Sequence, residues 1–548
     1  MVADSSTEWI LAVDLGTSGC KAGLVSTGGK VAAWGFEGVE TTLLPNGGAE
    51  QDPEAWWSAF LCVAKKLVAL GIVPARDIVA VCCSTQGEGT VAVGRDGKPL
   101  MNAILWMDAR GAEHLRTITH GLVRVAGYDV LRLLRWIRLS GGAPSPSGKD
   151  PAAHMLYVKC ERPGVYEKTY KFLNVLDYLN LRLTGHFVAT YDSILTSWVT
   201  DNRDASRVAY SDALLRQSGI QVDKFPELVR CTEVLGTLRP DVASELGLQP
   251  AVAVVAGAID NAAAAIGSGA VRDYETHLYL GTSSWLGAHV PFKKTDVVSA
   301  LASLPCAIPG RYLLTALQAT AGGNLTFLRD KILYHKDELL QEAEVPDVYK
   351  VLDRIAERTP AGSNGVLYAP WIYGERAPVE DRHVRAAIFN LSLENSREDV
   401  IRSVLEGVAL NTRWLLAPFE KFLGRPVDTI HVVGGGGNSD VWCQIFADVM
   451  WRRIRQMKDP IQANVRGAAF IGAIGLGLLD LDEIAARVEC AREYEPTGAH
   501  RQTYDTAFEA LTKLYRANKD IYRRLNGGGG VTHPGAAGGL HLTGQSKT

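Results

Sequence analysis

Three stretches of this sequence place glycine beside hydroxyl-bearing side chains where an apolar run ends. Residues 14–19 read DLGTSG, residues 280–285 read LGTSSW, and residues 434–439 read GGGGNS. Glycine turns leave backbone N–H groups accessible, and Thr and Ser add hydroxyl donors, so such loops can cradle a polyphosphate. A single glycine turn most often only reverses the chain. Two matched loops and a third glycine run together favour an anion site.

A lone carboxylate occupies a comparable position near the middle of the chain. Residues 254–269 read VVAGAIDNAAAAIGSG, so Asp260 follows an apolar β-branched run and precedes an alanine-rich run. The pattern predicts a strand, a turn and a helix, with Asp260 at the junction. An Asp before an alanine run is most often a helix N-cap, and that alternative stays open here.

The elements that carry the first loop are predicted to be a hairpin rather than a Rossmann unit. Residues 9–13 and 21–26 are predicted strands, and residues 27–30 form a turn that leads to a third strand. Asp52 and Pro53 predict a helix start, and the apolar periodicity runs on to Leu70. A strand over residues 78–83 then ends in the polar loop STQGEG.

The second half repeats this organisation. Its Gly-Thr-Ser loop again lies between two predicted strands, and a helix and another strand lead to the GGGGNS run. The predicted strands are residues 276–280, 284–290, 312–317 and 429–433, and the predicted helices start at 321, 398, 440 and 463. We therefore expect two α/β halves.

Composition excludes several classes of function. The chain has 548 residues and a net charge of −3, without a basic stripe, so nucleic acid and anionic membranes are poor candidates as partners. The nine cysteines include no Cys-x-x-Cys pair, and the N-terminus lacks a signal-peptide pattern, which favours a reduced, cytoplasmic protein. Neither the Walker pattern nor Gly-x-Gly-x-x-Gly occurs, which disfavours P-loop and dinucleotide enzymes.

With two further segments, GERAP at residues 374–378 and LEGVA at 405–409, the chain resembles the FGGY carbohydrate kinase family. This family belongs to the actin/Hsp70/hexokinase superfamily, and the resemblance runs from about residue 9 to about residue 522. It implies an α/β fold of two ribonuclease-H-like domains with a cleft between them. We expect a sugar-binding domain over residues 1–256, a nucleotide-binding domain over 257–525 and a disordered tail over 526–548.

The same resemblance implies ATP and Mg²⁺ as cofactors. Asp14 would help to hold hydrated magnesium, and Asp260 would be the catalytic base, with Asn261 beside it on the substrate. Backbone N–H groups, a lysine and Mg²⁺ would offset the charge on the transferred phosphate. The residues expected around ATP are Gly16, Thr17, Ser18, Lys21, Gly281, Thr282, Gly322, Thr326, Gly435, Gly436, Asn438 and Ser439.

The substrate is less sharply indicated, because the loop Gln86-Gly87-Glu88 lacks the His of the xylulose kinase pattern Gln-Met-His-Gly. Trp106 and Asp108, by contrast, resemble the xylulose pattern Trp-Asn-Asp-x-Arg. These five residues are the expected sugar contacts. As structural alternatives, Trp106 could lie in the core, Glu88 could be solvated, and Asp108 could pair with Arg110.

D-xylulose is therefore the first candidate acceptor, and a polyol or another pentulose (erythritol, glycerol, ribulose) is the alternative. A nucleotide-dependent switch or filament protein is the alternative from a different class. The expected partner is a small sugar or polyol, and a homodimer stays open.

Overall fold

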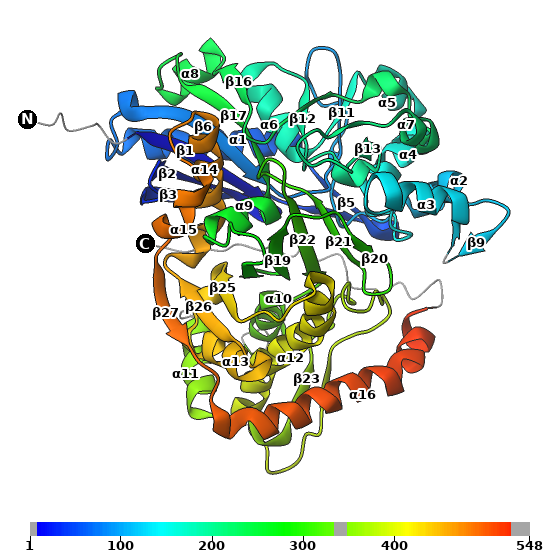
Figure 1. Ribbon diagram of the computed structural model, residues 1–548, viewed down its shortest axis with the longest axis vertical. Coiled ribbons are helices and arrows are strands. Elements are labelled where there is room, and N and C mark those ends of the chain that lie inside the picture. Colours follow the sequence, from blue (N-terminus) through cyan, green and yellow to red (C-terminus); the bar gives the residue numbers. More distant parts are fainter. Residues whose placement is uncertain (1–7, 126, 334–347, 528–548) are drawn as a thin grey trace, which may run out of the picture.

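Two β-sheets built on one plan form the centre of the molecule (Figure 1). The computed structural model describes residues 8–125, 127–333 and 348–527. In the first sheet, three antiparallel strands are followed by two strands parallel to β1 and by one antiparallel edge strand. In sheet order these strands are β3 (Val31–Gly38), β2 (Gly19–Ser26), β1 (Trp9–Gly16), β6 (Ile78–Thr85), β17 (Ala253–Ile259) and β16 (Val234–Thr237).

The second sheet repeats this order and adds two strands at one edge. Again a central strand has two antiparallel strands on one side and two parallel strands on the other. Its strands in order are β20 (Thr295–Asp296), β21 (Leu301–Pro305), β22 (Tyr312–Gln318), β19 (Ser284–Val290), β18 (Thr276–Leu280), β25 (Thr429–Val433), β26 (Arg453–Met457) and β27 (Cys490–Tyr494). The predicted pair of ribonuclease-H-like domains is confirmed.

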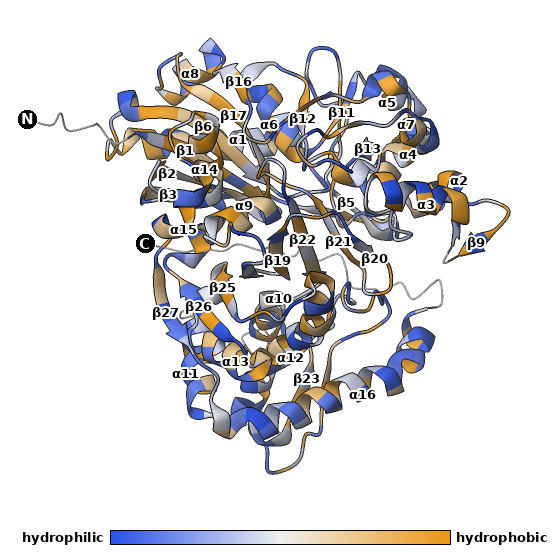
Figure 2. Cartoon of the chain, viewed as in Figure 1, coloured by the Kyte–Doolittle hydropathy of each residue, from blue (hydrophilic) through white to orange (hydrophobic). Residues whose placement is uncertain are grey.

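The central strands are apolar on both faces, and Figure 2 shows them in the hydrophobic colour. Helix α1 (Pro53–Ala69) covers one face of the first sheet and begins as predicted, because the Asp52 side chain accepts a hydrogen bond from the N–H of Glu54 at 2.9 Å. Within the described residues, no helix is long and apolar enough to cross a membrane. The tail predicted from residue 526 lies, from 528 on, outside the described residues.

Two helices cross in close contact where the domains meet. Helix α9 (Asp260–Gly267) follows β17, and helix α14 (Ala463–Gly475) follows β26 and packs against β1, β6 and β17 of the other domain. A Cβ on Gly267 would lie 1.8 Å from the Ala463 carbonyl oxygen, and one on Gly467 would lie 1.9 Å from that of Ala263. Only glycine permits this crossing, and it joins the two domains through one shared core.

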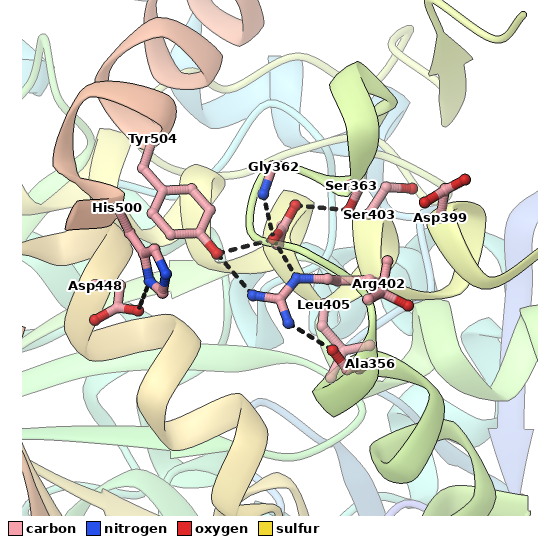
Figure 3. A network of polar contacts seen from close by, with 12 residues as sticks. Ala356, Gly362, Ser363, Asp399, Arg402, Ser403, Leu405, Asp448, His500 and Tyr504 are labelled. Carbon is pink, nitrogen blue, oxygen red and sulfur yellow. Dashed lines mark hydrogen bonds and ion pairs between the residues drawn. The ribbon is translucent and has the colours of Figure 1, made fainter. Parts of the chain in front are cut away.

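Helix α16 (Arg501–Asn526) is anchored to the second domain by a buried polar network (Figure 3). On the long helix α12 (Arg397–Leu423), Arg402 Nε donates to Glu406 Oε1 at 2.7 Å. The Tyr504 hydroxyl of α16 donates to the same oxygen at 2.8 Å and accepts from Arg402 Nη2 at 3.0 Å. The Ser363 hydroxyl donates to Glu406 Oε2 at 2.7 Å, so this carboxylate is well compensated inside the protein.

Candidate active site

The turn between β1 and β2 joins the predicted phosphate loop to the predicted sugar residues. The Thr17 hydroxyl donates to Gln86 Oε1 at 2.8 Å and accepts from Trp106 Nε1 at 3.0 Å. Gln51 donates to the Thr17 carbonyl at 2.7 Å and accepts from Gln86 Nε2 at 3.1 Å. The side chain of Ser18 in the same turn is exposed. The fold thus brings Thr17, Gln86 and Trp106 together and adds Gln51, which the sequence did not indicate.

Asp14 lies near the end of β1, one residue before buried Leu15, and receives contacts from both domains. Its Oδ1 accepts from the Ser84 hydroxyl at 3.4 Å and from Asn464 Nδ2 at 3.2 Å. Its Oδ2 lies 3.7 Å from Lys21 Nζ, which also donates to the carbonyl oxygen of Ile461 at 3.0 Å. Ile461 lies in the short helical turn Pro460–Gln462 that leads into the crossing helix α14, and Asn464 is the second residue of α14, so Asp14 and Lys21 sit at the domain junction.

The donor set around Asp14 fits a hydrated magnesium ion. Asn464 is buried, and its Oδ1 has no hydrogen-bond partner within the described residues; the same holds for Oε1 of buried Gln462. Mg²⁺ prefers oxygen ligands and keeps several waters, so one carboxylate and nearby amide oxygens suit it. Across the described ranges, no cluster of three or more His, Cys, Asp or Glu side chains suits a metal. Asp14 would therefore hold Mg²⁺, with Asn464 bonding to its waters.

Asp260 is the first residue of α9, and its side chain does not cap the helix. The N-cap position belongs to Ile259, and no side-chain cap bond forms, so the N-cap alternative is wrong. Burial raises the pKa of Asp260 to about 7, and the negative charges of Asp14 and Glu88 act in the same direction. Asn261 lies beside it, half-buried. A carboxyl with this pKa can accept a proton near neutral pH.

Glu88 carries the strained backbone of the loop after β6, with a φ of 62°. Its Oε2 lies 3.8 Å from Nη2 of Arg376, which comes from the other domain. The Arg376 guanidinium lies 5.8 Å from the ring centre of Trp106, and Trp106 is half-buried rather than part of the core. Burial raises the pKa of Glu88, while Arg376 and Lys149 oppose that shift. Glu88, Gly87 and Trp106 thus belong to the neighbourhood of Thr17 and Asp260.

Arg376 reaches Glu88 because its neighbour Glu375 is fixed from three directions. The Glu375 carboxylate accepts from the Ala319 N–H at 2.9 Å, from the Arg376 N–H at 2.7 Å and from Asn411 Nδ2 at 2.5 Å. Asn411 lies on α12, and burial raises the pKa of Glu375 to about 7. The Arg376 side chain is directed to Glu88 rather than to the neighbouring Glu375 carboxylate.

Asp108 is committed to its own loop. Its Oδ2 accepts from Arg110 Nη2 at 2.6 Å and from the Ala49 N–H at 2.9 Å, and its Oδ1 accepts from the Arg110 N–H at 2.9 Å. The side chain of Asp108 is 1% exposed. The local ion pair with Arg110 is confirmed, and a direct contact between Asp108 and a sugar stays a prediction.

The glycine loops of the second domain meet around Leu280 and Gly281. The Gly322 N–H donates to the Gly281 carbonyl at 2.9 Å, and a Cβ on Gly322 would lie 2.7 Å from that oxygen. A Cβ on Gly434 would lie 2.6 Å from the Leu280 carbonyl, and one on Gly436 would lie 2.9 Å from the Leu280 Cβ. Close approach therefore requires glycine at these three positions. The side chain of Thr282 and the backbone of Gly435 are left exposed.

Two of the residues expected around ATP have partners inside the protein. Ser439 accepts from the Trp442 N–H at 3.2 Å as the N-cap of α13 (Asp440–Met450) and donates to Asp353 at 2.7 Å. The Thr326 hydroxyl lies 3.0 Å from the Tyr349 hydroxyl. Asn438 is exposed. The adenosine contacts of this group stay predictions.

Tyr279 connects the two sides of the site. It lies on β18 two residues before Gly281, and its ring stacks on Trp285 with centroids 4.0 Å apart. Burial raises the pKa of Tyr279, and the negative charges of Asp14 and Asp260 add to that shift. The end of β18 is therefore near both carboxylates, and the second phosphate loop adjoins the candidate base and metal site.

Comparisons with known proteins show the family of the chain. The N-terminal and C-terminal domain models of the FGGY family of carbohydrate kinases match residues 9–267 and 277–476. The xylulose kinase of Bacillus subtilis is 28% identical over 522 residues, covering 94% of this chain and 99% of that protein. The gluconokinase of the same organism is 25% identical over 521 residues, covering 95% and 98%.

A solved structure, the ligand-bound xylulose kinase from Lactobacillus acidophilus, shares the fold with a TM-score of 0.81 at 24% identity. The match covers 94% of the present chain and 100% of the Lactobacillus protein. The chain therefore belongs to the FGGY family of carbohydrate kinases, which are ATP-dependent sugar phosphotransferases.

Proposed function

We propose that this kinase transfers the γ-phosphoryl group of ATP to a terminal hydroxyl of a small neutral sugar. D-xylulose is the first candidate, with D-xylulose 5-phosphate as the product. The observation that carries the proposal is the position of Asp260. It lies between the Thr17 network, the Asp14 site and the loop after β18, and its pKa is raised to about 7.

In the proposed mechanism, Asp260 accepts the proton of the acceptor hydroxyl as that oxygen attacks the γ-phosphorus. The bond between this phosphorus and the bridging oxygen breaks, and ADP leaves. Lys21 and the backbone N–H groups after β1 and β18 offset the charge on the transferred group. Bound Mg²⁺ would add charge neutralisation on the phosphate oxygens. Gln86 and Trp106 position the acceptor, because Thr17 and Gln51 fix their side chains.

A charge argument supports a neutral acceptor over an aldonate. The relatives include both a xylulose kinase and a gluconokinase, and gluconate carries a carboxylate. Arg376 is the cation beside Trp106, and it already pairs with Glu88 at 3.8 Å. Asp260 adds a second negative charge close to Glu88. A substrate carboxylate would meet repulsion from Glu88 and Asp260, and the two cations that act on Glu88, Arg376 and Lys149, already offset the charge of that carboxylate. Erythritol, glycerol and ribulose are neutral as well and remain the alternatives.

The test is ADP release with MgATP over a panel of D-xylulose, D-ribulose, glycerol, erythritol and D-gluconate. We expect the highest kcat/KM for D-xylulose. A higher value for a polyol would refute D-xylulose and would mean that the loop at residues 86–89 sets the specificity. Basal ATP turnover with every acceptor would refute the proposed reaction.

A further inference from the structure

A cavity outside the kinase site is lined by three arginine side chains. Its volume is about 610 Å³, and it lies between α2 (Ala112–Thr119), α3 (Val130–Leu139) and α7 (Asp212–Ser218). Figure 1 shows these helices at the outer edge of the first domain, far from α9. The polar side chains that line it are Thr117, Arg132, Arg135, Arg216 and Gln217, and the lining contains no carboxylate.

The contacts of these side chains leave positive charge and N–H donors uncompensated. Arg132 Nη1 donates to the Ile118 carbonyl at 2.7 Å, and Arg135 Nη1 donates to Gln217 Oε1 at 2.9 Å. This bond uses the Gln217 oxygen, and the Nε2 group of the same amide is buried and has no partner within the described residues. In the same part of the chain, no ion pair joins Arg132, Arg135 or Arg216 to a carboxylate.

The carboxylate that lies closest along α3 does not compensate this charge. Asp129 is the N-cap of the helix, and its Oδ1 accepts the backbone N–H of Arg132 at 3.1 Å. Within the described residues none of the three guanidinium groups forms an ion pair, so an anion with two or more charges in the cavity would be attracted to all three. Guanidinium groups match phosphate oxygens in shape and can bind them through two parallel hydrogen bonds.

We propose that this cavity is a second binding site, which takes the phosphate group of a phosphate ester. The volume is sufficient for a phosphorylated small sugar, so the product of the reaction is one candidate; that identity alone rests on the proposed function. A lipid headgroup offers the same phosphate chemistry, and Leu131 and Leu134 on α3, which are 73% and 58% exposed, would contact the lipid surface.

Calorimetric titration with inorganic pyrophosphate tests the site. The titration uses Mg²⁺-free buffer with saturating ADP, so that the kinase site is filled. In the Arg135→Gln/Arg216→Gln variant we expect the Kd to rise by at least about tenfold, since two charge-assisted contacts are lost. The matched control is Arg162→Gln/Arg207→Gln, which removes two exposed arginines outside the cavity and should leave the Kd unchanged. Equal Kd values for wild type and the Arg135/Arg216 variant would overturn the proposal.

Two further arms separate the sources of the phosphate. Binding of glycerol phosphate that is lost in the Arg135/Arg216 variant would support a soluble ester. Co-sedimentation with phosphatidylglycerol vesicles that is lost in this variant and in about 0.5 M salt would support a headgroup. Binding in neither arm would contradict the proposal. Because both arginines are exposed, the variant should keep full ADP release with saturating acceptor, and this assay also reports separately on the proposed function.

Discussion

Replacing Asp260 by Asn should abolish turnover and stabilise the protein at the same time. The pKa of the carboxyl rises from 3.8 to about 7 on folding. Because the pKa is raised, the folded state keeps a proton that the unfolded chain has already lost, and stability falls as the pH rises towards and through 7. About three pKa units correspond to about 4 kcal/mol, and water near a half-buried side chain reduces this to about 2 kcal/mol.

Asn is neutral at every pH and avoids this cost. We therefore expect Asp260→Asn to be more stable than wild type by about 2 kcal/mol at pH 8, with a smaller difference at pH 5. Turnover should fall at least about 10²-fold, because the acceptor loses its general base. The Kd for ADP should stay the same, since the glycine loops of the second domain are untouched.

The assays are calorimetric melting at pH 5 and pH 8, ADP release with saturating D-xylulose, and titration with ADP. Asp260→Glu is the matched control, because it keeps a carboxylate at the same helix start and should retain part of the activity and of the pH dependence. Wild-type turnover in Asp260→Asn would remove this residue from the base role. A lower melting temperature than wild type at pH 8 would refute the argument from burial.

Four other predictions follow from the geometry. For wild type, log kcat/KM should rise with pH through an apparent pKa of about 7, as Asp260 ionises; a flat profile between pH 5.5 and 8.5 would contradict this. Glu88→Gln should raise the kcat/KM ratio of D-gluconate to D-xylulose at least about tenfold, because it frees Arg376; an unchanged ratio would refute the charge argument. Asn464→Ala should weaken Mn²⁺ binding, followed by electron paramagnetic resonance with ADP, about threefold to tenfold, whereas wild-type affinity would exclude Asn464 from the metal site. Gly467→Ala should destabilise the protein by about 1–3 kcal/mol in denaturant unfolding, and a neutral effect would disprove the tight helix crossing.

Local patterns in the sequence predicted most of the elements that frame the site. The strand at residues 429–433 and the helix at 440–450 have the predicted bounds, since a β-branched run and a Ser-capped periodic segment are strong local signals. The two Gly-Thr-Ser turns were also predicted from a local signal, which is the glycine in each turn. A tight turn or a close approach of two backbone segments requires glycine. The glycine therefore marks such a position even in a single sequence.

The contacts that complete the site depend on distant parts of the chain and have no local signal. Asn464 reaches Asp14 across 450 residues, and only the crossing of α9 and α14 brings them together. Gln51 joins Thr17 and Gln86 from a third segment. Single-sequence periodicity reports which face of an element is buried, but not which element covers it.

Two side chains show how partners decide a role that residue type leaves open. Asp108 and Glu88 are both carboxylates in polar loops after strands. Arg110 and the Ala49 N–H bind Asp108 within its own domain, whereas Glu88 faces Arg376 from the other domain. The resemblance to family motifs gave both the same prediction as sugar contacts. The tertiary partners separate them.

The central claim is that the residues around Thr17, Asp14 and Asp260 form one site that phosphorylates a neutral sugar. The most direct measurement is the kcat/KM of wild type with MgATP for D-xylulose and D-gluconate, with the product identified by phosphorus NMR. The account predicts a phosphate ester at the terminal carbon of D-xylulose and at least about tenfold lower kcat/KM for D-gluconate. Equal or faster phosphorylation of D-gluconate, or no ester from any neutral acceptor, would contradict it.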